Sequence, residues 1–141
     1  MRKFFVVGAL AALGAAALAI PASGAQSIVF HVDAISTGSH FNQAHQVVTF
    51  TNRLAQHGDR DDTVGHSKGR CHILSRTRAH CHLVYFFPNG KIKAQGRSFY
   101  RREHERQPVV GGTRAYNGVG GKILVEDALD RVTHLDFFLI R

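Results

Sequence analysis

Three of the ten histidines stand in a pattern that suggests metal chemistry. His72 precedes a polar segment, and His80 and His82 follow it at alternating positions. Three imidazoles on one face of a hairpin would supply a zinc site with an open fourth position. No recognised zinc-binding spacing accompanies them, and a chain with this many histidines places some together by chance. We therefore favour solvated histidines and expect no metal and no other cofactor.

The two cysteines indicate a disulfide. Cys71 and Cys81 lie in two strand-like segments joined by the polar residues 75–79. If they lie directly opposite each other, strand alternation places the cysteines, Ile73, Ala79 and Leu83 on one apolar face and the histidines on the other. Together with an export signal at the N-terminus, this geometry favours a bridge over a free or nucleophilic thiol.

The elements that would carry these groups are strands. Segments rich in β-branched and aromatic residues recur with short turns between them, and residues 88–90 (Pro-Asn-Gly) are the strongest hairpin signal. Residues 56–62 are expected to form a polar loop. The expected strand segments are 27–35, 45–54, 64–74, 80–87, 91–100, a segment ending at the valines 109–110, 120–126 and 132–140. This pattern predicts an all-β fold, an antiparallel sandwich or barrel of about eight strands. A closed barrel leaves no unpaired edge and has room for at most one small ligand.

The N-terminus predicts export. Arg2 and Lys3 precede an apolar run from residue 4 to 20 and the small residues 22–25. This is the pattern of a signal peptide, 1–25, cleaved after Ala25, and a membrane anchor is the less favoured alternative. The expected mature domain, 26–141, would be secreted or extracytoplasmic, with no membrane association after cleavage. Loss of two basic residues lowers the formal charge from +8 to +6.

The basic charge does not indicate nucleic-acid binding. The densest charge run, residues 101–106, alternates in sign and contains no aromatic residue for base stacking. We interpret it as a solvated loop or a strand rim and expect no nucleic-acid partner.

A double-glycine turn carries the clearest motif. Gly111 and Gly112 follow two valines, and Thr113 is placed to bond nearby backbone through its hydroxyl. Residues 109–118 (VVGGTRAYNG) resemble the VVGGTG-x-(Y/F)-x-G stretch of the allene oxide cyclase and dirigent barrel superfamily. Residues 50–54 resemble the F-x-N-x-L strand of that family, and residues 87–96 its central hairpin. The resemblance covers roughly residues 27–140 and departs from the family at Arg114, where glycine is usual.

This resemblance implies an eight-stranded antiparallel β-barrel, and it suggests candidate site residues. Asp33 aligns with the aspartate of the dirigent His-Asp pair, the proposed proton donor, although here Val32 separates it from His31. If Asp33 faces the barrel interior, desolvation would raise its pKa and suit proton donation, with His31 on the same side as a ligand contact. The alternative is that both face solvent. Tyr85 is a further ligand-binding candidate and Tyr100 a catalytic one, unless both are packing residues with polar tips.

Two functions remain open at this stage. One is a barrel that binds a small hydrophobic molecule and isomerises, cyclises or stereochemically guides it, as an entropy trap. The other is a non-catalytic structural or interaction barrel with a filled interior. Related barrels carry unrelated functions, so the resemblance leaves the enzymatic question undecided. Dimers and trimers occur in the family, so a homo-oligomer is compatible with the sequence, although no strand indicates an interface.

Overall fold

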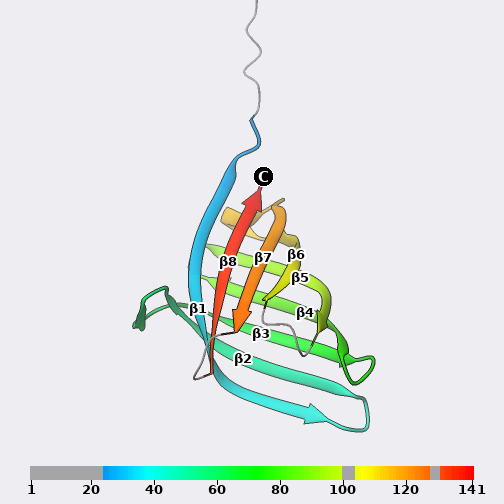
Figure 1. The fold of residues 1–141 in the computed structure, drawn as a ribbon. Helices are drawn as coiled ribbons and strands as arrows, with labels where there is room; N and C mark the ends of the chain where they lie inside the picture. Colours follow the sequence, from blue (N-terminus) through cyan, green and yellow to red (C-terminus); the bar gives the residue numbers. More distant parts are fainter. Residues whose placement is uncertain (1–23, 100–103, 128–130) are drawn as a thin grey trace, which may run out of the picture.

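The computed structural model describes residues 24–99, 104–127 and 131–141. Most of the expected signal peptide, and Tyr100, lie outside these residues. The described chain forms one closed barrel of eight antiparallel strands in sequence order, as predicted (Figure 1). The elements are β1 (Ser27–Asn42), β2 (Val47–Gln56), β3 (Asp59–Ile73), β4 (Arg78–Phe87), β5 (Gly90–Phe99), β6 (His104–Gly112), the 3-10 helix η1 (Arg114–Tyr116), β7 (Gly120–Asp127) and β8 (Val132–Ile140).

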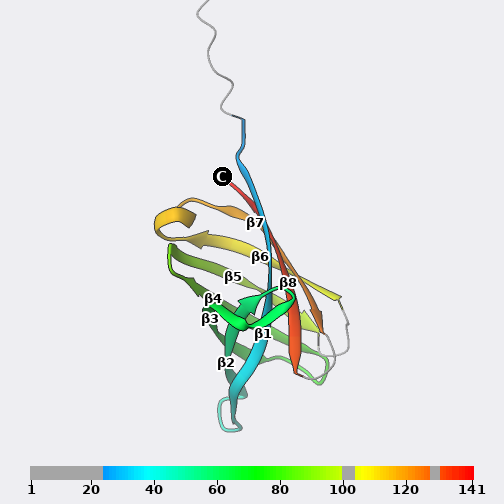
Figure 2. The ribbon, with the colours of Figure 1, turned by 90° about the vertical axis from the view of Figure 1, so that its left-hand side faces the viewer.

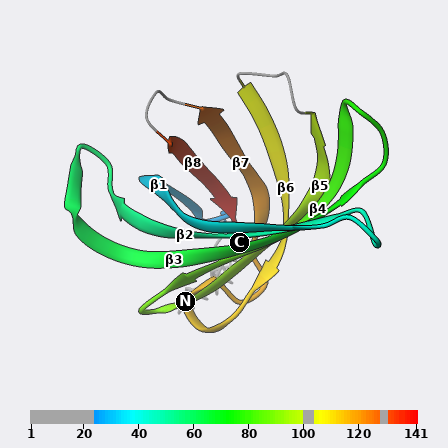
Figure 3. The ribbon, with the colours of Figure 1, turned by 90° about the horizontal axis from the view of Figure 1, so that it is seen from below.

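Closure of the barrel depends on β1, which pairs with β2 on one side and β8 on the other. The register of β1 with β2 shifts between Ser36 and Gly38, and there the long strand bends to follow the barrel wall (Figure 1). Backbone hydrogen bonds between Gln26 and Arg141 join the two ends of the barrel segment, which lie together in the side view (Figure 2). Seen from below, the strands follow one another around the barrel (Figure 3).

The cysteine hairpin has the predicted register. Cys71 lies opposite Cys81, Ile73 opposite Ala79, and Gly69 opposite Leu83. The two cysteines form a disulfide and are buried together with Ala79 and Leu83 in the barrel core. Near the bridge, the outward residues Arg70, His72, His80 and His82 are polar. The register of this hairpin is therefore determined by the alternation of buried apolar residues with solvent-exposed polar ones.

The expected polar loop at residues 56–62 is wrong. Only His57 and Gly58 form the turn, with Gly58 at a φ of 84°, and β3 already begins at Asp59. Residues 59–63 are exposed on both faces of this projecting hairpin, so no apolar alternation marks them as a strand. Arg53 supports the hairpin, because its guanidinium donates hydrogen bonds to the carbonyl of Arg60 and the hydroxyl of Thr63.

The double-glycine segment ends β6 and leads into η1. Gly111 has a φ of 154°, and a side chain at Gly112 would collide with the carbonyl oxygens of Tyr116 and Lys91. The Thr113 hydroxyl accepts a hydrogen bond from the Lys91 amide, which ties the turn to β5. Arg114 adopts a φ of 54°, in the left-handed region. The chain thus keeps the turn, with arginine at a position that favours glycine.

One end of the barrel is filled with aromatic rings. Phe137 stacks on Phe30 with centroids 4.5 Å apart, and the edges of Tyr85 and Phe87 meet it at 5.1 and 5.8 Å. Tyr116, from η1, adds its ring beside Phe30 and Phe87. This packing closes the barrel end nearer to the termini. Among the described residues, no helix is long and apolar enough to cross a membrane.

Candidate functional site

The other half of the barrel contains a cavity of about 290 Å³. Side chains from seven strands line it, and they combine an apolar lining with amide, hydroxyl, phenol and carboxyl groups. The lining residues are Ala34, Ser36, Phe50, Asn52, Leu83, Tyr85, Ser98, Glu105, Gln107, Val125, Asp127, Thr133 and Leu135. Exposed Ser36 and Asp127 mark its outer end, and buried Tyr85 lies next to the aromatic cluster. The cavity is therefore a polar-lined recess in a half-filled barrel.

Tyr85 is the buried polar group of this recess. The residue is 2% exposed, and its phenol donates a hydrogen bond of 2.9 Å to Oε1 of Gln107. Burial holds the pKa of the Tyr85 phenol well above its usual value, so the phenol stays protonated at physiological pH. A neutral phenol with an amide beside it can donate to or accept from a ligand oxygen. Tyr85 thus lines the recess as a neutral hydrogen-bonding group.

Glu105 places a carboxylate at the seam between β5 and β6. Within the described residues, the register of these strands covers only Ile92–Ala94 against Val109–Gly112. Pro108 lies directly before the paired residues of β6, and it has no N–H to donate to a neighbouring strand. Glu105 bridges the strands there, since it accepts hydrogen bonds from the Ser98 hydroxyl at 3.0 and 3.1 Å and from the Phe99 amide.

The same carboxylate also reaches the surface. Glu105 and Val125 line both the interior cavity and an outer groove of about 420 Å³. Residues 101–106 were expected to form a solvated loop or a strand rim. Residues 101–103 lie outside the described residues, and Glu105 of β6 points inward. The alternation of Glu105, Gln107 and buried Val109 along β6 was the available signal. This alternation was hard to recognise because the neighbours of Glu105 in the sequence are also charged, and they face outward.

Asp33 does not face the barrel interior. Its neighbours Val32 and Ala34 belong to the core, so Asp33 points to the outer face of β1. It is nevertheless only 3% exposed, because His134 of β8 and the turn after β2 cover it. His31 lies on the same outer face, as alternation requires, and its Nδ1 lies 2.6 Å from Oδ1 of Asp136. The two residues are therefore separated from the cavity by the barrel wall.

The ionisation of Asp33 also differs from what an interior position would give. Burial alone would raise the pKa of its carboxyl group, but hydrogen bonds with His57 and His134 and the backbone N–H of Gly58 bring the pKa below its ordinary value. Asp33 is therefore a carboxylate at neutral pH. Its placement and charge favour a role as acceptor or ligand over that of proton donor to an interior substrate.

The hairpin histidines lie on the outer surface. His72 pairs with His80, the ring of His80 lies 5.1 Å from that of His82, and Nε2 of His80 lies 3.2 Å from the amide nitrogen of Gln95. In the part of the chain that the structure describes, the group of three or more residues able to converge on a metal is a different one, Asp33, His57 and His134. His57 and His134 were not metal candidates from sequence, because they lie 24 and 101 positions from Asp33 in the chain.

Comparison with known proteins supports the fold. No family model and no curated protein sequence matches the chain. Solved structures do match. A pterocarpan synthase dirigent protein has a TM-score of 0.70 and 14% identity, covering 99% of both chains. An exo-specific intermolecular Diels-Alderase has a TM-score of 0.67 and 17% identity over 83% of this chain and 98% of its own. A pyocyanin demethylase has a TM-score of 0.66 and 15% identity over 79% of this chain and 99% of its own. The chain has the eight-stranded barrel fold of the dirigent and allene oxide cyclase-like proteins.

Proposed function

We propose that the barrel binds a small, mostly apolar molecule in its interior cavity and directs its ring closure or isomerisation by holding one folded shape. The observation that carries the proposal is the recess itself, in which apolar side chains alternate with polar ones and Tyr85, Gln107 and Glu105 gather on β4 and β6. A ligand with one oxygen function would place that oxygen against the Tyr85 phenol and its body against Leu83, Val125 and Leu135.

The chemistry expected of such a site is mainly conformational. A flexible chain that is confined in a water-poor cavity loses most of its unproductive conformers before it reacts, and this orientation contributes to the rate. The neutral phenol of Tyr85 would stabilise negative charge on a ligand oxygen, and the carboxylate of Glu105 would accept a proton or stabilise positive charge. Dirigent and Diels-Alderase proteins among the structural neighbours support a barrel that guides a reaction of this kind.

A short isoprenoid alcohol such as geraniol, an apolar chain with one hydroxyl group, serves as a probe. The test is a titration followed by amide chemical shifts in ¹H–¹⁵N NMR spectra. We expect saturable shifts at the cavity residues and loss of binding in Ser36→Phe, which places a ring in the cavity mouth. The matched control is Ser27→Phe on the same strand, exposed and outside the cavity lining, which should bind as the wild type does.

Two results would contradict the proposal. One is unchanged geraniol affinity in a folded Ser36→Phe variant. The other is a set of shifts confined to the outer face, with the cavity residues unaffected. Either result would favour the alternative of a non-catalytic barrel, for which the aromatic filling around Phe137 is the supporting observation.

We also propose that the domain is exported. The disulfide between Cys71 and Cys81 supports this, because such bridges persist in oxidising compartments. Expression of the full chain in a host that secretes proteins, followed by N-terminal sequencing of the extracytoplasmic product, tests the proposal. The expected mature N-terminus is Gln26, and retention of residues 1–25 in a cytoplasmic product would contradict it.

A further inference from the structure

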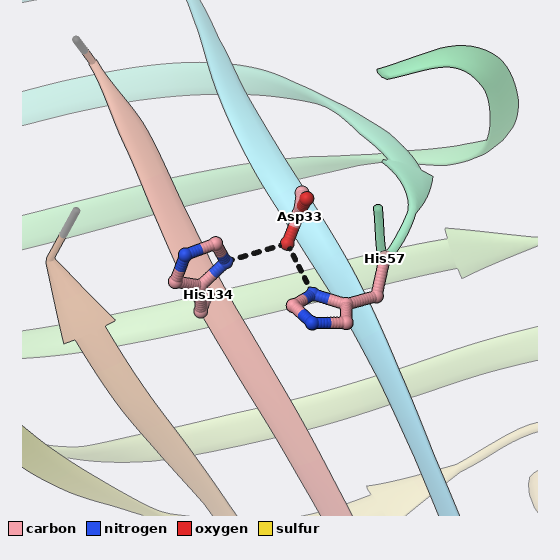
Figure 4. A group of neighbouring side chains, drawn as sticks. All are labelled: Asp33, His57 and His134. Atoms are coloured by element: carbon pink, nitrogen blue, oxygen red, sulfur yellow. Dashed lines mark hydrogen bonds and ion pairs between the residues drawn. The ribbon is translucent and has the colours of Figure 1, made fainter. Parts of the chain in front are cut away.

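A cluster of ionisable side chains on the outer face of the barrel plays no part in the proposed cavity function. Asp33 of β1 is paired across the sheet with His134 of β8, and His57 reaches over from the turn between β2 and β3 (Figure 4). Nδ1 of His57 lies 2.8 Å and Nδ1 of His134 lies 2.6 Å from Oδ1 of Asp33. Segments far apart in sequence thus place two imidazoles on one carboxylate.

The distances suit a metal ion as well as hydrogen bonds. The three potential ligand atoms all lie within 4.8 Å of one another. Ligand atoms around a tetrahedral zinc ion with bonds of about 2.0–2.1 Å lie roughly 3.3 Å apart, so the two imidazole nitrogens need to move away from the Asp33 oxygen by only about 0.5–0.7 Å. To bind the metal, each imidazole would offer the lone pair of Nδ1 and carry its ring proton on Nε2.

The cluster is buried on one side and open to solvent on the other. The side chain of Asp33 is 4% exposed, whereas those of His57 and His134 are 55% and 34% exposed. The carboxylate forms the floor, and the imidazoles form a rim that faces solvent. The N–H of Gly58 lies 3.4 Å from Oδ2 and helps to orient the carboxylate, as outer-shell donors do in metal sites.

The surroundings add further potential ligands. His31 and Asp136, the next outward-facing pair along β1 and β8, hydrogen-bond to each other at 2.6 Å, and the ring of His31 lies 6.3 Å from that of His57. Two carboxylates and three imidazoles therefore share this part of the wall. Imidazole nitrogen with carboxylate oxygen is a donor set that suits zinc and neighbouring divalent transition metals.

We propose that Asp33, His57 and His134 bind one divalent transition-metal ion, with zinc the best match, and that the fourth position is open to water. The ion would tie the turn between β2 and β3 to the β1–β8 wall. This differs from the expectation from sequence, which considered only His72, His80 and His82 and favoured no metal.

Isothermal titration of chelator-treated protein with zinc chloride tests the proposal. We expect one ion per chain and a binding constant that falls at least roughly 100-fold in His57→Gln and in His134→Gln, because each change removes one of three protein ligands. Both residues are partly exposed, so the variants should fold, and circular dichroism checks this. The matched control is His82→Gln, an exposed outward histidine on β4, which should bind zinc as the wild type does.

A second measurement separates the metal site from non-specific binding to histidines. Imidazole ¹⁵N shifts of His57 and His134 should change at Nδ1 on addition of zinc, and the metal should raise the melting temperature of the wild type but not of His57→Gln. The proposal is overturned if folded wild-type protein shows no saturable 1:1 binding. It is equally overturned if His82→Gln loses the binding while His57→Gln keeps it.

Discussion

The disulfide between Cys71 and Cys81 should supply a measurable share of the stability of the barrel. The bridge joins directly opposed residues of β3 and β4, ten positions apart in sequence, and both cysteines are buried. In the chain-entropy account, closing a loop of this length lowers the entropy of the unfolded chain by an amount worth about 2.7 kcal/mol. Unfolding entropies near 2.1 cal/mol/K per residue turn this into a loss of about 11 °C in melting temperature for an ordered chain of roughly 120 residues.

The assay is urea unfolding of oxidised and dithiothreitol-reduced wild-type protein at the same pH. Reduction keeps both sulfur atoms in the core, so the difference isolates the bridge from packing. Alanine variants complete a double-mutant cycle, since serine would leave hydroxyl groups in an apolar core. We expect Cys71→Ala and Cys81→Ala each to lose the full contribution of the bridge and the double variant to lose little more.

The outcome that refutes this reasoning is specific. If reduced and oxidised proteins unfold within about 0.5 kcal/mol of each other, the rest of the barrel already restricts the loop in the unfolded state, and the entropic account fails. Additive losses in the two single variants would show that sulfur packing, and not the bridge, carries the effect.

Three further changes have expected results. Burial raises the pKa of Tyr85, so above about pH 10 the unfolded state loses this phenolic proton while the folded state keeps it, and the free energy of unfolding should fall as pH rises. Absorbance should show a phenol that ionises only on unfolding, and Tyr85→Phe should remove that phase. Arg114→Gly should raise the free energy of unfolding in urea by about 0.5–1 kcal/mol, because arginine holds a φ of 54° there, and an unchanged or lower value would contradict this. Gly121→Ala should lower the melting temperature by an amount equivalent to about 2–3 kcal/mol, since φ is 115° and the methyl group would collide with the Phe138 carbonyl; a variant as stable as the wild type would contradict it.

The strand content and the barrel were predictable because most strands carry their own signals. In the cysteine hairpin, one apolar face and one polar face leave a single register that buries both sulfurs, and the structure has that register. The projecting residues 59–63 were missed for the opposite reason. Both of their faces are exposed, so nothing in their composition distinguishes strand from loop.

The orientation of Asp33 was less accessible from sequence. Val32, Asp33 and Ala34 are all buried. The barrel core buries Val32 and Ala34, whereas His57, in the turn between β2 and β3, covers Asp33 from outside. Local alternation allows either parity for such a segment, and the covering residue His57 is 24 positions away. Long-range contacts between polar side chains leave no periodic trace in a single sequence, so the Asp33 cluster could be found only in three dimensions.

The two sites share a wall but not a chemistry. Ala34 and Leu135 line the cavity, while their neighbours Asp33 and His134 point outward from the same two strands. A metal ion on the outer face would therefore fix the β1–β8 wall without contributing a ligand or a proton inside the barrel. The two groups proposed to act on a ligand in the cavity, Tyr85 on β4 and Glu105 on β6, lie on other strands. Loss of zinc should consequently change the stability of the wall more than the identity of the molecule that the cavity accepts.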